Sequence, residues 1–305
     1  MQIVQGLENF RPEAGGGVVA LGVFDGVHLG HRAILATAVS TARRLALSPL
    51  ACTFDRHPME VLQPERAPLP ITTLGERLDL IAATGIETVL VLPFTRALAS
   101  IEPDAFVKDV LAGRLRAREV VVGFNHRFGR GARGDTALLE ALGRELGFGT
   151  EVVPPLTLDG VPVSSTEIRT ALQAGDVERA AAFLGRPYRI WGTVVRGAGR
   201  GHTLGFPTAN LLADRTLLVP PGVYACRVRL DPRSLPAVVN IGRRPTFGET
   251  ALAVEAHILD FDGDLYGGSI GLDFVARLRD ERKFPSIEAL KSRIALDVAE
   301  ARQRL

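Results

Sequence analysis

The pattern of apolar segments changes at about residue 186, and this change constrains the fold more than any other feature. Between Val18 and Leu156, short strand-like apolar runs alternate with stretches whose apolar residues recur at helical spacing. Beyond Arg186 and Pro187, strand-like runs follow one another across Gly, Pro and Asp turns, with no helical stretch between them. The first pattern predicts an α/β fold with a parallel sheet, and the second predicts an antiparallel sheet or small barrel.

The length supports this division, because 305 residues exceed the usual size of a single domain. We expect an α/β domain over residues 1–184 and an antiparallel β-barrel over 187–305, with a C-terminal helix from about residue 286. The strands expected in the first domain are 18–24, 49–54, 88–94, 119–124 and 150–156. Those expected in the second are 188–197, 222–230, 235–242, 254–261 and 269–279. Two short helices, at 164–175 and 176–185, precede the linker.

Composition excludes several functional classes. The net charge of +2 is too small for a dedicated nucleic-acid surface, and the chain has no apolar run of about 18 residues. We therefore expect a cytoplasmic protein with neither nucleic acid nor membrane as partner; the oligomeric state is unknown. Cys52 and Cys226 lie far apart in apolar runs, which favours buried free thiols.

Two histidines stand where the first expected strand gives way to a helix. In GVFDGVHLGH, His28 and His31 follow the turn residues Asp25 and Gly26. A helix N-terminus favours anions, and residues three apart in its first turn face the same way, so two imidazoles can reach one phosphate. Taken alone, HLGH is more typical of surface or packing histidines at a helix start, and it is the strand, the FDG turn and the glycine around the pair that favour a functional role. A metal site is less fitting, because helical histidine ligands usually stand four residues apart.

Other loops at the carboxyl ends of the expected strands carry polar groups. The stretch after residue 123 contains GxGxxG, but its glycines come too late after the strand for a dinucleotide fingerprint, and a flexible basic loop over polyphosphate fits better. Asn125 in this loop is suited to hydrogen bonding a nucleotide or a substrate. The run SSTEIR offers hydroxyls at a helix start, followed by Arg169; the alternative is a capping box of Ser164 with Glu167.

The second domain carries a glycine-rich stretch and an acid in an apolar run. GRGHTLGFPTANL lets backbone N–H groups approach phosphates, and Thr208 and Asn210 are hard oxygen ligands suited to magnesium. Glu255 lies in VEAHI, where an inward carboxylate would cost free energy without a role. A general base is one such role, and a solvent-facing position on the strand is the alternative. The GxxxxGK[ST] phosphate loop is absent, because none of the three lysines follows a glycine.

Taken together, the two halves resemble the bacterial bifunctional riboflavin kinase/FAD synthetase family over essentially the whole chain. The resemblance is carried by nine motifs in order: GVFDGVHLGH, TFDRHP, VVVGFNHRFG, SSTEIR, GRGHTLGFPTANL, PPGVYACRV, VVNIGRRPTFG, VEAHILDFDGDLYG and LRDERKF. The resemblance implies a Rossmann-like nucleotidyltransferase domain followed by a β-barrel riboflavin kinase domain. It also implies that riboflavin is phosphorylated by ATP to FMN, and that FMN is then adenylylated by ATP to FAD with release of pyrophosphate.

The resemblance further implies roles for individual residues, with ATP as co-substrate and Mg²⁺ as cofactor. The catalytic residues would be the base Glu255, with His28 and His31 in the other half. The adenylyltransferase half would bind ATP through Phe24, Asp25, Gly30, Asn125, Arg127, Ser164, Ser165, Thr166 and Arg169. The kinase half would bind ATP through Gly199, Gly201, Gly205, Pro207, Thr208 and Asn210, of which Thr208 and Asn210 would hold the metal. The flavin would contact His57, Asn125, Arg279 and Phe284.

Two positions depart from the family pattern. Arg56 replaces a usual proline, and His126 stands where phenylalanine is common. Arg56 either adds a phosphate contact or points outward, and His126 retains stacking while adding a polar tip. The main rival is a nucleotidyltransferase for another phosphate or alcohol, such as a pantetheine-phosphate or glycerol-phosphate enzyme, with an unrelated second domain. A flavin-binding module without catalysis is a further alternative.

Overall fold

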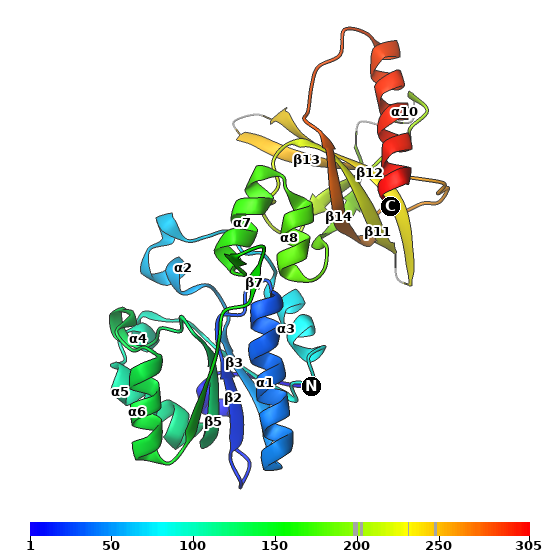
Figure 1. Ribbon diagram of the computed structural model, residues 1–305. Coiled ribbons are helices and arrows are strands. Elements are labelled where there is room, and N and C mark those ends of the chain that lie inside the picture. The colour runs from blue at the N-terminus through cyan, green and yellow to red at the C-terminus, as the bar shows by residue number, and fades with distance from the viewer. Residues whose placement is uncertain (198–200, 202–203, 231, 247–248) are drawn as a thin grey trace. The chain divides into compact units, whose positions relative to one another are not determined.

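A computed structural model describes residues 1–197, 201, 204–230, 232–246 and 249–305. The chain forms two compact units, Met1–Ser165 and Thr166–Leu305, whose elements are labelled in Figure 1. The two short helices before the linker pack with the second unit. The expected domain boundary at 184–187 stays a prediction. None of the helices in the described part of the chain is long and apolar enough to cross a membrane.

The first unit is built on a parallel sheet with the strand order β1-β4-β3-β2-β5-β6. Its strands are β1 (Gln2–Gln5), β2 (Gly17–Leu21), β3 (Ser48–Phe54), β4 (Thr88–Leu92), β5 (Ala117–Gly123) and β6 (Gly149–Val153). The helices are α1 (Leu29–Leu45), α2 (Pro58–Leu62), α3 (Leu74–Ala82), α4 (Arg96–Ala99), α5 (Pro103–Ala105), a π-helix (Phe106–Arg114) and α6 (Thr136–Leu146). Single 3-10 turns lie at Leu7–Asn9, Pro64–Arg66 and Arg130–Ala132, and a short hairpin joins β7 (Thr157–Leu158) to β8 (Val161–Pro162).

Both faces of this sheet are buried, as expected for parallel strands covered by helices. Successive residues of β2 point to opposite faces, so that Val18 and Ala20 pack under α1 while Val19 and Leu21 pack on the other side. Figure 1 shows α1 and α3 on one face and α6 on the other. The α/β prediction is therefore confirmed, and so is the buried free thiol of Cys52, whose pKa burial raises to about 12.

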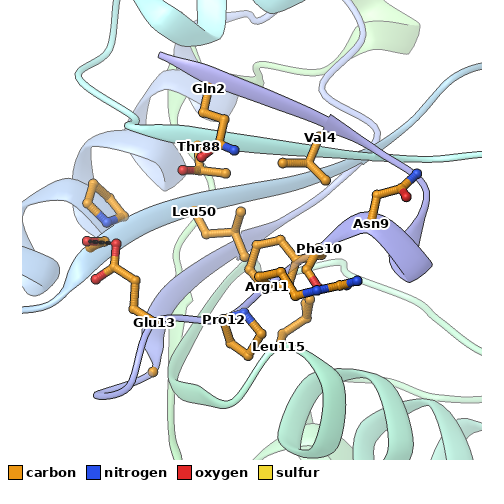
Figure 2. Close-up of a pocket in the computed structure, with 14 residues that line it drawn as sticks. Gln2, Val4, Asn9, Phe10, Arg11, Pro12, Glu13, Leu50, Thr88 and Leu115 are labelled. Atoms are coloured by element: carbon orange, nitrogen blue, oxygen red, sulfur yellow. Dashed lines mark hydrogen bonds between the residues drawn. The ribbon is translucent and has the colours of Figure 1, made fainter.

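One strand of the sheet was not predicted. β1 is a short edge strand whose residues are mostly exposed, so it lacks an apolar run. Next to it, a cavity of about 160 Å³ lies at the amino ends of the strands, lined by Gln2, Gly17, Ser48 and Thr88, the first residues of β1 to β4. Figure 2 shows Phe10, Pro12 and Leu50 against it. This cavity is at the opposite edge of the sheet from the loops singled out above.

The second unit begins with α7 (Ser165–Ala174) and α8 (Val177–Leu184) and continues as a closed antiparallel barrel in the order β10-β13-β12-β11-β14-β9. Its strands are β9 (Tyr188–Val195), β10 (Ala209–Ala213), β11 (Gly222–Leu230), β12 (Arg233–Thr246), β13 (Glu249–Ile258) and β14 (Ser269–Arg279). β10 was not predicted, because it is short and its Leu212 faces solvent. Cys226 is a buried free thiol, as predicted, and burial raises its pKa.

The C-terminal helix α10 (Ile287–Arg304) packs on the outer face of the barrel, which confirms the predicted barrel and helix. Ala301 of this helix is in one apolar cluster with Val223 and Ala225 of β11 and Val238 of β12. The face of β11 and β12 that carries these residues is therefore the one covered by α10.

The stability of the first unit should depend on the layer under α6. Leu139 is fully buried, and truncation to alanine leaves a cavity, so Leu139→Ala should lower the free energy of unfolding by about 2–5 kcal/mol. Leu146→Ala on the same helix changes a partly exposed side chain and should cost at most about 0.5 kcal/mol. Urea unfolding followed by circular dichroism measures both, and equal losses would contradict the assigned core.

Candidate functional site

The first candidate site lies at the carboxyl ends of β2 and β5. These strands are neighbours in the sheet, and the chain builds outward from them in opposite directions. Ligands of open α/β sheets bind at such a point. The loop after β2 carries HLGH and leads into α1, while the loop after β5 carries Asn125. The two loops therefore leave from adjacent strands.

His28 and His31 form a stacked pair at the start of α1. His28 is the N-cap, and its Nδ1 accepts a hydrogen bond from the backbone N–H of His31 at 3.2 Å. A neutral imidazole that accepts at Nδ1 carries its proton on Nε2, where it can donate. The two ring centroids are 3.6 Å apart, with 19° between the planes. Stacked donors at a helix N-terminus are suited to a phosphate.

Gly30 explains why the pair can stack. A Cβ at residue 30 would lie 3.2 Å from both Nδ1 and Cε1 of the His28 ring. Only a few contacts of real Cβ atoms are that close, so a larger residue would push the ring away from the helix. The glycine between the two histidines therefore has a packing role in the site.

The loop before α1 has a strained backbone. Phe24 and Val27 have positive φ angles of 53° and 37° on either side of Gly26, whose φ is 80°. For residues other than glycine, each such conformation costs about 1–3 kcal/mol. It persists only where the surrounding structure fixes the backbone. Phe24 is fully buried, and its ring meets His31 edge-on at 5.4 Å. Its side chain supports His31, so the predicted contact with ATP would have to use its backbone.

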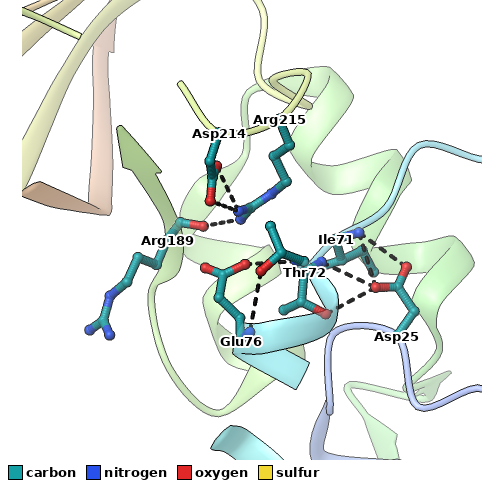
Figure 3. Close-up of polar contacts among 8 residues, drawn as sticks. Asp25, Ile71, Thr72, Glu76, Arg189, Asp214 and Arg215 are labelled. Carbon is teal, nitrogen blue, oxygen red and sulfur yellow. Dashed lines mark hydrogen bonds and ion pairs between the residues drawn. The ribbon is translucent and has the colours of Figure 1, made fainter. Parts of the chain in front are cut away.

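Asp25 holds this loop against the segment before α3. Its carboxylate accepts hydrogen bonds from the backbone N–H groups of Ile71 and Thr72 and from Thr72 Oγ1, at 3.0–3.1 Å (Figure 3). Thr72 Oγ1 in turn accepts from the N–H of Gly26. The buried carboxylate therefore fixes the strained loop, and its predicted contact with ATP stays a prediction.

Arg77 is a site residue that the sequence did not reveal. It is almost fully buried, and its guanidinium donates to the carbonyl oxygen of Val23 at 2.8 Å and to that of Asp55 at 3.3 Å. Burial lowers the pKa of this guanidinium, against the opposing effect of nearby carboxylates. Arg77 thus joins the loop after β2 to the loop after β3. In the sequence, Arg77 cannot be distinguished from an ordinary solvent-facing arginine on an amphipathic helix.

The loop after β3 carries Asp55, Arg56 and His57. Burial raises the pKa of Asp55, but the hydrogen bond from the Phe94 N–H and the ion pair with Arg56 outweigh this and lower it. Arg56 is more than half exposed, and its guanidinium is 3.0 Å from Asp55. His57 caps α2, with Nδ1 accepting from the N–H of Met59. Its predicted contact with flavin stays a prediction.

The loop after β5 is held by its own packing. A Cβ at Gly134 would lie 2.7 Å from the Phe128 ring, and one at Gly129 would lie 2.7 Å from Pro103. Arg130 and Arg133 both pair with Glu102. Two of the three glycines of GxGxxG, Gly129 and Gly134, are thus explained by close packing. In the same loop, Asn125 is exposed, and Arg127 pairs with Asp135 at 3.5 Å.

His126 stacks on Phe128, with ring centroids 5.8 Å apart and planes 19° apart. Its Nε2 is buried, and burial lowers the pKa of the ring to about 4. At neutral pH, His126 is therefore an uncharged ring in a place where the family pattern has an aromatic one.

The run SSTEIR lies at the start of α7. In the first unit, Ser165 Oγ donates to the carbonyl oxygen of Asp25 at 3.0 Å, which links this run to the loop before α1. Thr166 and Arg169 belong to the second unit and are the second and fifth residues of α7. The predicted contacts of Ser164, Ser165, Thr166 and Arg169 with ATP stay predictions.

The second candidate site is a row of neighbours across the barrel. Glu255 of β13 lies directly opposite Asn210 of β10 on one side and Asn240 of β12 on the other. Asn240 is opposite Val223 of β11, which is opposite Arg279 of β14. Paired residues of antiparallel strands point to the same face. The predicted metal ligand and base therefore share the face that α10 covers. Arg279, whose pairing with Val223 lies at a register shift, is held on the same face by Asp297 of α10.

The segment before β10 is anchored near this row. The carbonyl oxygen of Pro207 is 2.8 Å from Nδ1 of His257, and the Phe206 ring meets that imidazole edge-on at 5.5 Å. The N–H of Phe206 donates to the carbonyl oxygen of Gly201. A Cβ at Gly201 would lie 2.9 Å from Thr208 Oγ1, so the glycine leaves a cradle beside this hydroxyl. Gly205 has a φ of 84°, and Gly199 lies outside the described residues.

Arg279 is held by the C-terminal helix. Its Nε–H is shared between both carboxylate oxygens of Asp297, at 3.0 Å each, and Nη2 donates to Oδ2 at 2.8 Å. Asp297 is only 1% exposed. The guanidinium carbon also lies 5.5 Å from the centre of the Phe284 ring, which Arg282 approaches to 4.8 Å. Arg215 fixes the segment after β10 in this unit. Its guanidinium donates to the carboxylate of Asp214 and to the carbonyl oxygen of Arg189 (Figure 3).

The stacked His28 and His31 at a helix start in an α/β unit, and Glu255 between two asparagines on a barrel, have the chemistry of a two-domain nucleotide-dependent transferase. Residues 11–167 match the FAD synthetase family, and residues 184–305 match the riboflavin kinase family. The chain belongs to the bifunctional riboflavin kinase/FMN adenylyltransferases. The second match excludes the rival with an unrelated second domain.

Individual relatives agree over nearly the whole length. The bifunctional riboflavin kinase/FMN adenylyltransferase of Pseudomonas fluorescens is 41% identical over 99% of this chain and 97% of its own. The proteins of that name from Escherichia coli K12 and Bacillus subtilis are each 37% identical, over 99% and 95% of this chain and 97% and 93% of their own. A crystal structure named as a macrolide-efflux protein from Streptococcus pneumoniae superposes with a TM-score of 0.92 at 30% identity, covering 99% of both chains.

The low pKa of His126 has a consequence for stability. Its imidazole should titrate near pH 4 in the folded protein, below the ordinary value of 6.5. The unfolded chain takes up this proton first, so the folded state loses stability as pH falls from about 6.5 toward 4. His126→Phe should reduce this loss. Histidine NMR titration measures the pKa, and urea midpoints at pH 7 and 5 measure the loss; an equal fall for both proteins would contradict it.

Proposed function

We propose that the two units perform two separate transfers at the residues described above. The barrel transfers the γ-phosphoryl group of ATP to the 5′-hydroxyl of riboflavin, and the α/β unit transfers AMP from ATP to the phosphate of FMN. One observation carries this division: each compact unit contains its own set of charged and polar groups, His28 with His31 in one and Asn210 with Glu255 in the other. The family to which the chain belongs is named for both activities.

In the kinase reaction the nucleophile is a neutral alcohol, which needs a base. Glu255 is the proposed base: it takes the proton of the 5′-hydroxyl as the oxygen bonds to the γ-phosphorus and the bond to the β-phosphate oxygen breaks, releasing ADP. Its position between the amides of Asn210 and Asn240 supports this role. Such a base contributes about a hundred- to ten-thousandfold in rate.

The kinase residues fit a divalent cation. Thr208 supplies a hydroxyl beside the cradle left by Gly201, and Asn210 supplies an amide oxygen next to the carboxylate of Glu255. These are the hard oxygen donors that Mg²⁺ prefers. When bound, the ion would neutralise part of the charge on the ATP phosphates. Thr208 and Asn210 are the residues proposed to hold it.

In the adenylyl transfer the nucleophile is already an anion, so the α/β unit needs no base. A phosphate oxygen of FMN attacks the α-phosphorus of ATP, and pyrophosphate leaves. Two repelling anions must be brought together and the departing charge stabilised, which is the work of aligned donors. The stacked imidazoles of His28 and His31 and the N–H groups of the first turn of α1 are suited to this work.

Single substitutions should separate the two activities. Glu255→Gln keeps the side-chain size but removes the base, so FMN formation should fall about a hundred- to ten-thousandfold while added FMN is still adenylylated. His28→Ala removes an aligned donor, so adenylylation should fall about a hundred- to a thousandfold while riboflavin is still phosphorylated. Product analysis by chromatography with riboflavin or FMN, ATP and magnesium measures both.

Each variant is the control for the other in the two assays, and a urea unfolding curve that matches the wild type shows that the substituted unit is folded. Loss of both reactions in a folded variant would contradict the division into two sites. A wild-type chain that forms FMN but no FAD would restrict the proposal to the barrel. Failure to form FMN from riboflavin would remove the kinase assignment.

The packing of Gly30 gives a second test of the α/β site. Gly30→Ala places a Cβ 3.2 Å from the His28 ring, which must shift, so adenylylation should fall by roughly tenfold or more. Gly75→Ala is the matched control: Gly75 is also the second residue of its helix, and the added Cβ would lie 4.0 Å from Thr73 Oγ1, an ordinary contact. Steady-state rates with FMN and ATP compare the two, and equal effects would contradict the role of the glycine.

A further inference from the structure

We infer that Asn240 recognises the hydroxyl groups of the flavin's ribityl chain and thereby brings the terminal hydroxyl to Glu255. This inference rests on the proposed kinase function, and it concerns a residue that was not singled out in the sequence. In VVNIG, Asn240 occurs within an otherwise apolar strand-like run. Its role follows from where the barrel register places it.

Asn240 lies between the two ends of the site. Its strand partner on one side is Glu255, and on the other it is Val223, whose own partner is Arg279. Neighbouring strands are about 4.8 Å apart, so Glu255 and Arg279 are separated by about 14 Å along the row. A substrate that contacts both must cross Asn240 on the way.

The amide points to the substrate face. Val238, two residues earlier on β12, packs with Val223 and Ala301 under α10, and residues two apart on a strand share a face. The pairing of β12 with both neighbours is regular here, without a register shift. Asn240, which is half-buried, therefore points to the same face as Glu255.

The position is costly for an amide that has no ligand to bind. Asparagine is disfavoured in strand interiors, and a half-buried carboxamide needs hydrogen-bond partners. The chain also keeps space open beside it: a Cβ at Gly242 would lie 3.4 Å from Asn240 Nδ2 and 2.5 Å from Glu281 Oε1. The missing side chain at residue 242 thus leaves a polar cradle between an amide and a carboxylate.

The chemistry of the carboxamide matches a polyol. It offers one acceptor and two donors, and each hydroxyl of a sugar alcohol both donates and accepts. Val223, the next residue in the row, offers no polar group. Hydroxyl recognition between Arg279 and Glu255 therefore falls to Asn240, with Glu281 at its side.

The test compares Asn240→Leu with wild type on riboflavin and on analogues that lack one ribityl hydroxyl each. Leucine has a similar size and lacks the amide. With riboflavin, kcat/KM of the kinase reaction should fall about five- to a hundredfold, mainly through KM for riboflavin, with KM for ATP unchanged. With the analogue that lacks the contacted hydroxyl, wild type and variant should differ by less than about twofold, because the two changes remove the same interaction.

The unchanged KM for ATP in the kinase reaction serves as the control for the fold of the barrel, and Asn240→Gln, which keeps the amide on a longer stem, should recover part of the loss. An equal fall in kcat/KM for riboflavin and for every deoxy analogue would overturn the inference, since a purely structural role predicts that result. Unchanged kinetics with riboflavin would also overturn it. A wild-type chain that fails to phosphorylate riboflavin would instead overturn the kinase function itself.

Discussion

The regular pairing of antiparallel strands is the constraint on which the kinase site depends. Asn210, Glu255 and Arg279 are up to 69 residues apart in the chain, and only the register of the closed barrel brings them into one row. Because side chains alternate between faces, a slip of one residue in the pairing of β13 with β10 or β12 would turn Glu255 away from its neighbours, and both pairings are free of register shifts. Closure of the barrel removes the free edges that would permit such a slip. The chemistry of the barrel therefore depends on the whole sheet.

The α/β unit solves a different problem, which is to hold a strained loop at a helix start. Positive φ angles at Phe24 and Val27 are costly, and the hydrogen bonds of the buried Asp25 carboxylate and of the Arg77 guanidinium offset that cost. These groups fix the loop that leads into the stacked histidines. Preorganised donors stabilise developing charge without rearranging during the reaction, which is why rigidity under His28 matters for transfer.

The sequence predicted the parts of the fold that repeat and missed the parts that depend on distant neighbours. Apolar runs were sufficient for β2 to β5, whose central residues are buried on both faces, and for the half-buried edge strand β6, but β1 is an exposed edge strand and shows no such pattern. His28, His31 and Glu255 could be found because their residue types are unusual in their surroundings. Arg77 and Asn240 could not, because an arginine on a helix and an amide in a strand acquire meaning only from their partners. Conversely, the GxGxxG loop was predicted to bind polyphosphate. In the structure, two of its glycines are required by close packing against Phe128 and Pro103.

The C-terminal helix completes the end of the row at Arg279, the proposed flavin contact, through one buried carboxylate. Asp297 receives both Arg279 and Arg293, and a carboxylate that is 1% exposed would be costly without them. This pairing fixes the helix against β14 and fixes the guanidinium of Arg279 at the same time. Since Nε and Nη2 of Arg279 are engaged by Asp297 and Nη1 by the carbonyl of Asp280, its flat face is the surface best placed for an aromatic ring. The Phe284 ring already lies 5.5 Å from that guanidinium carbon, so recognition of a flavin there would be by stacking, with hydrogen bonding left to the polar residues farther along the row.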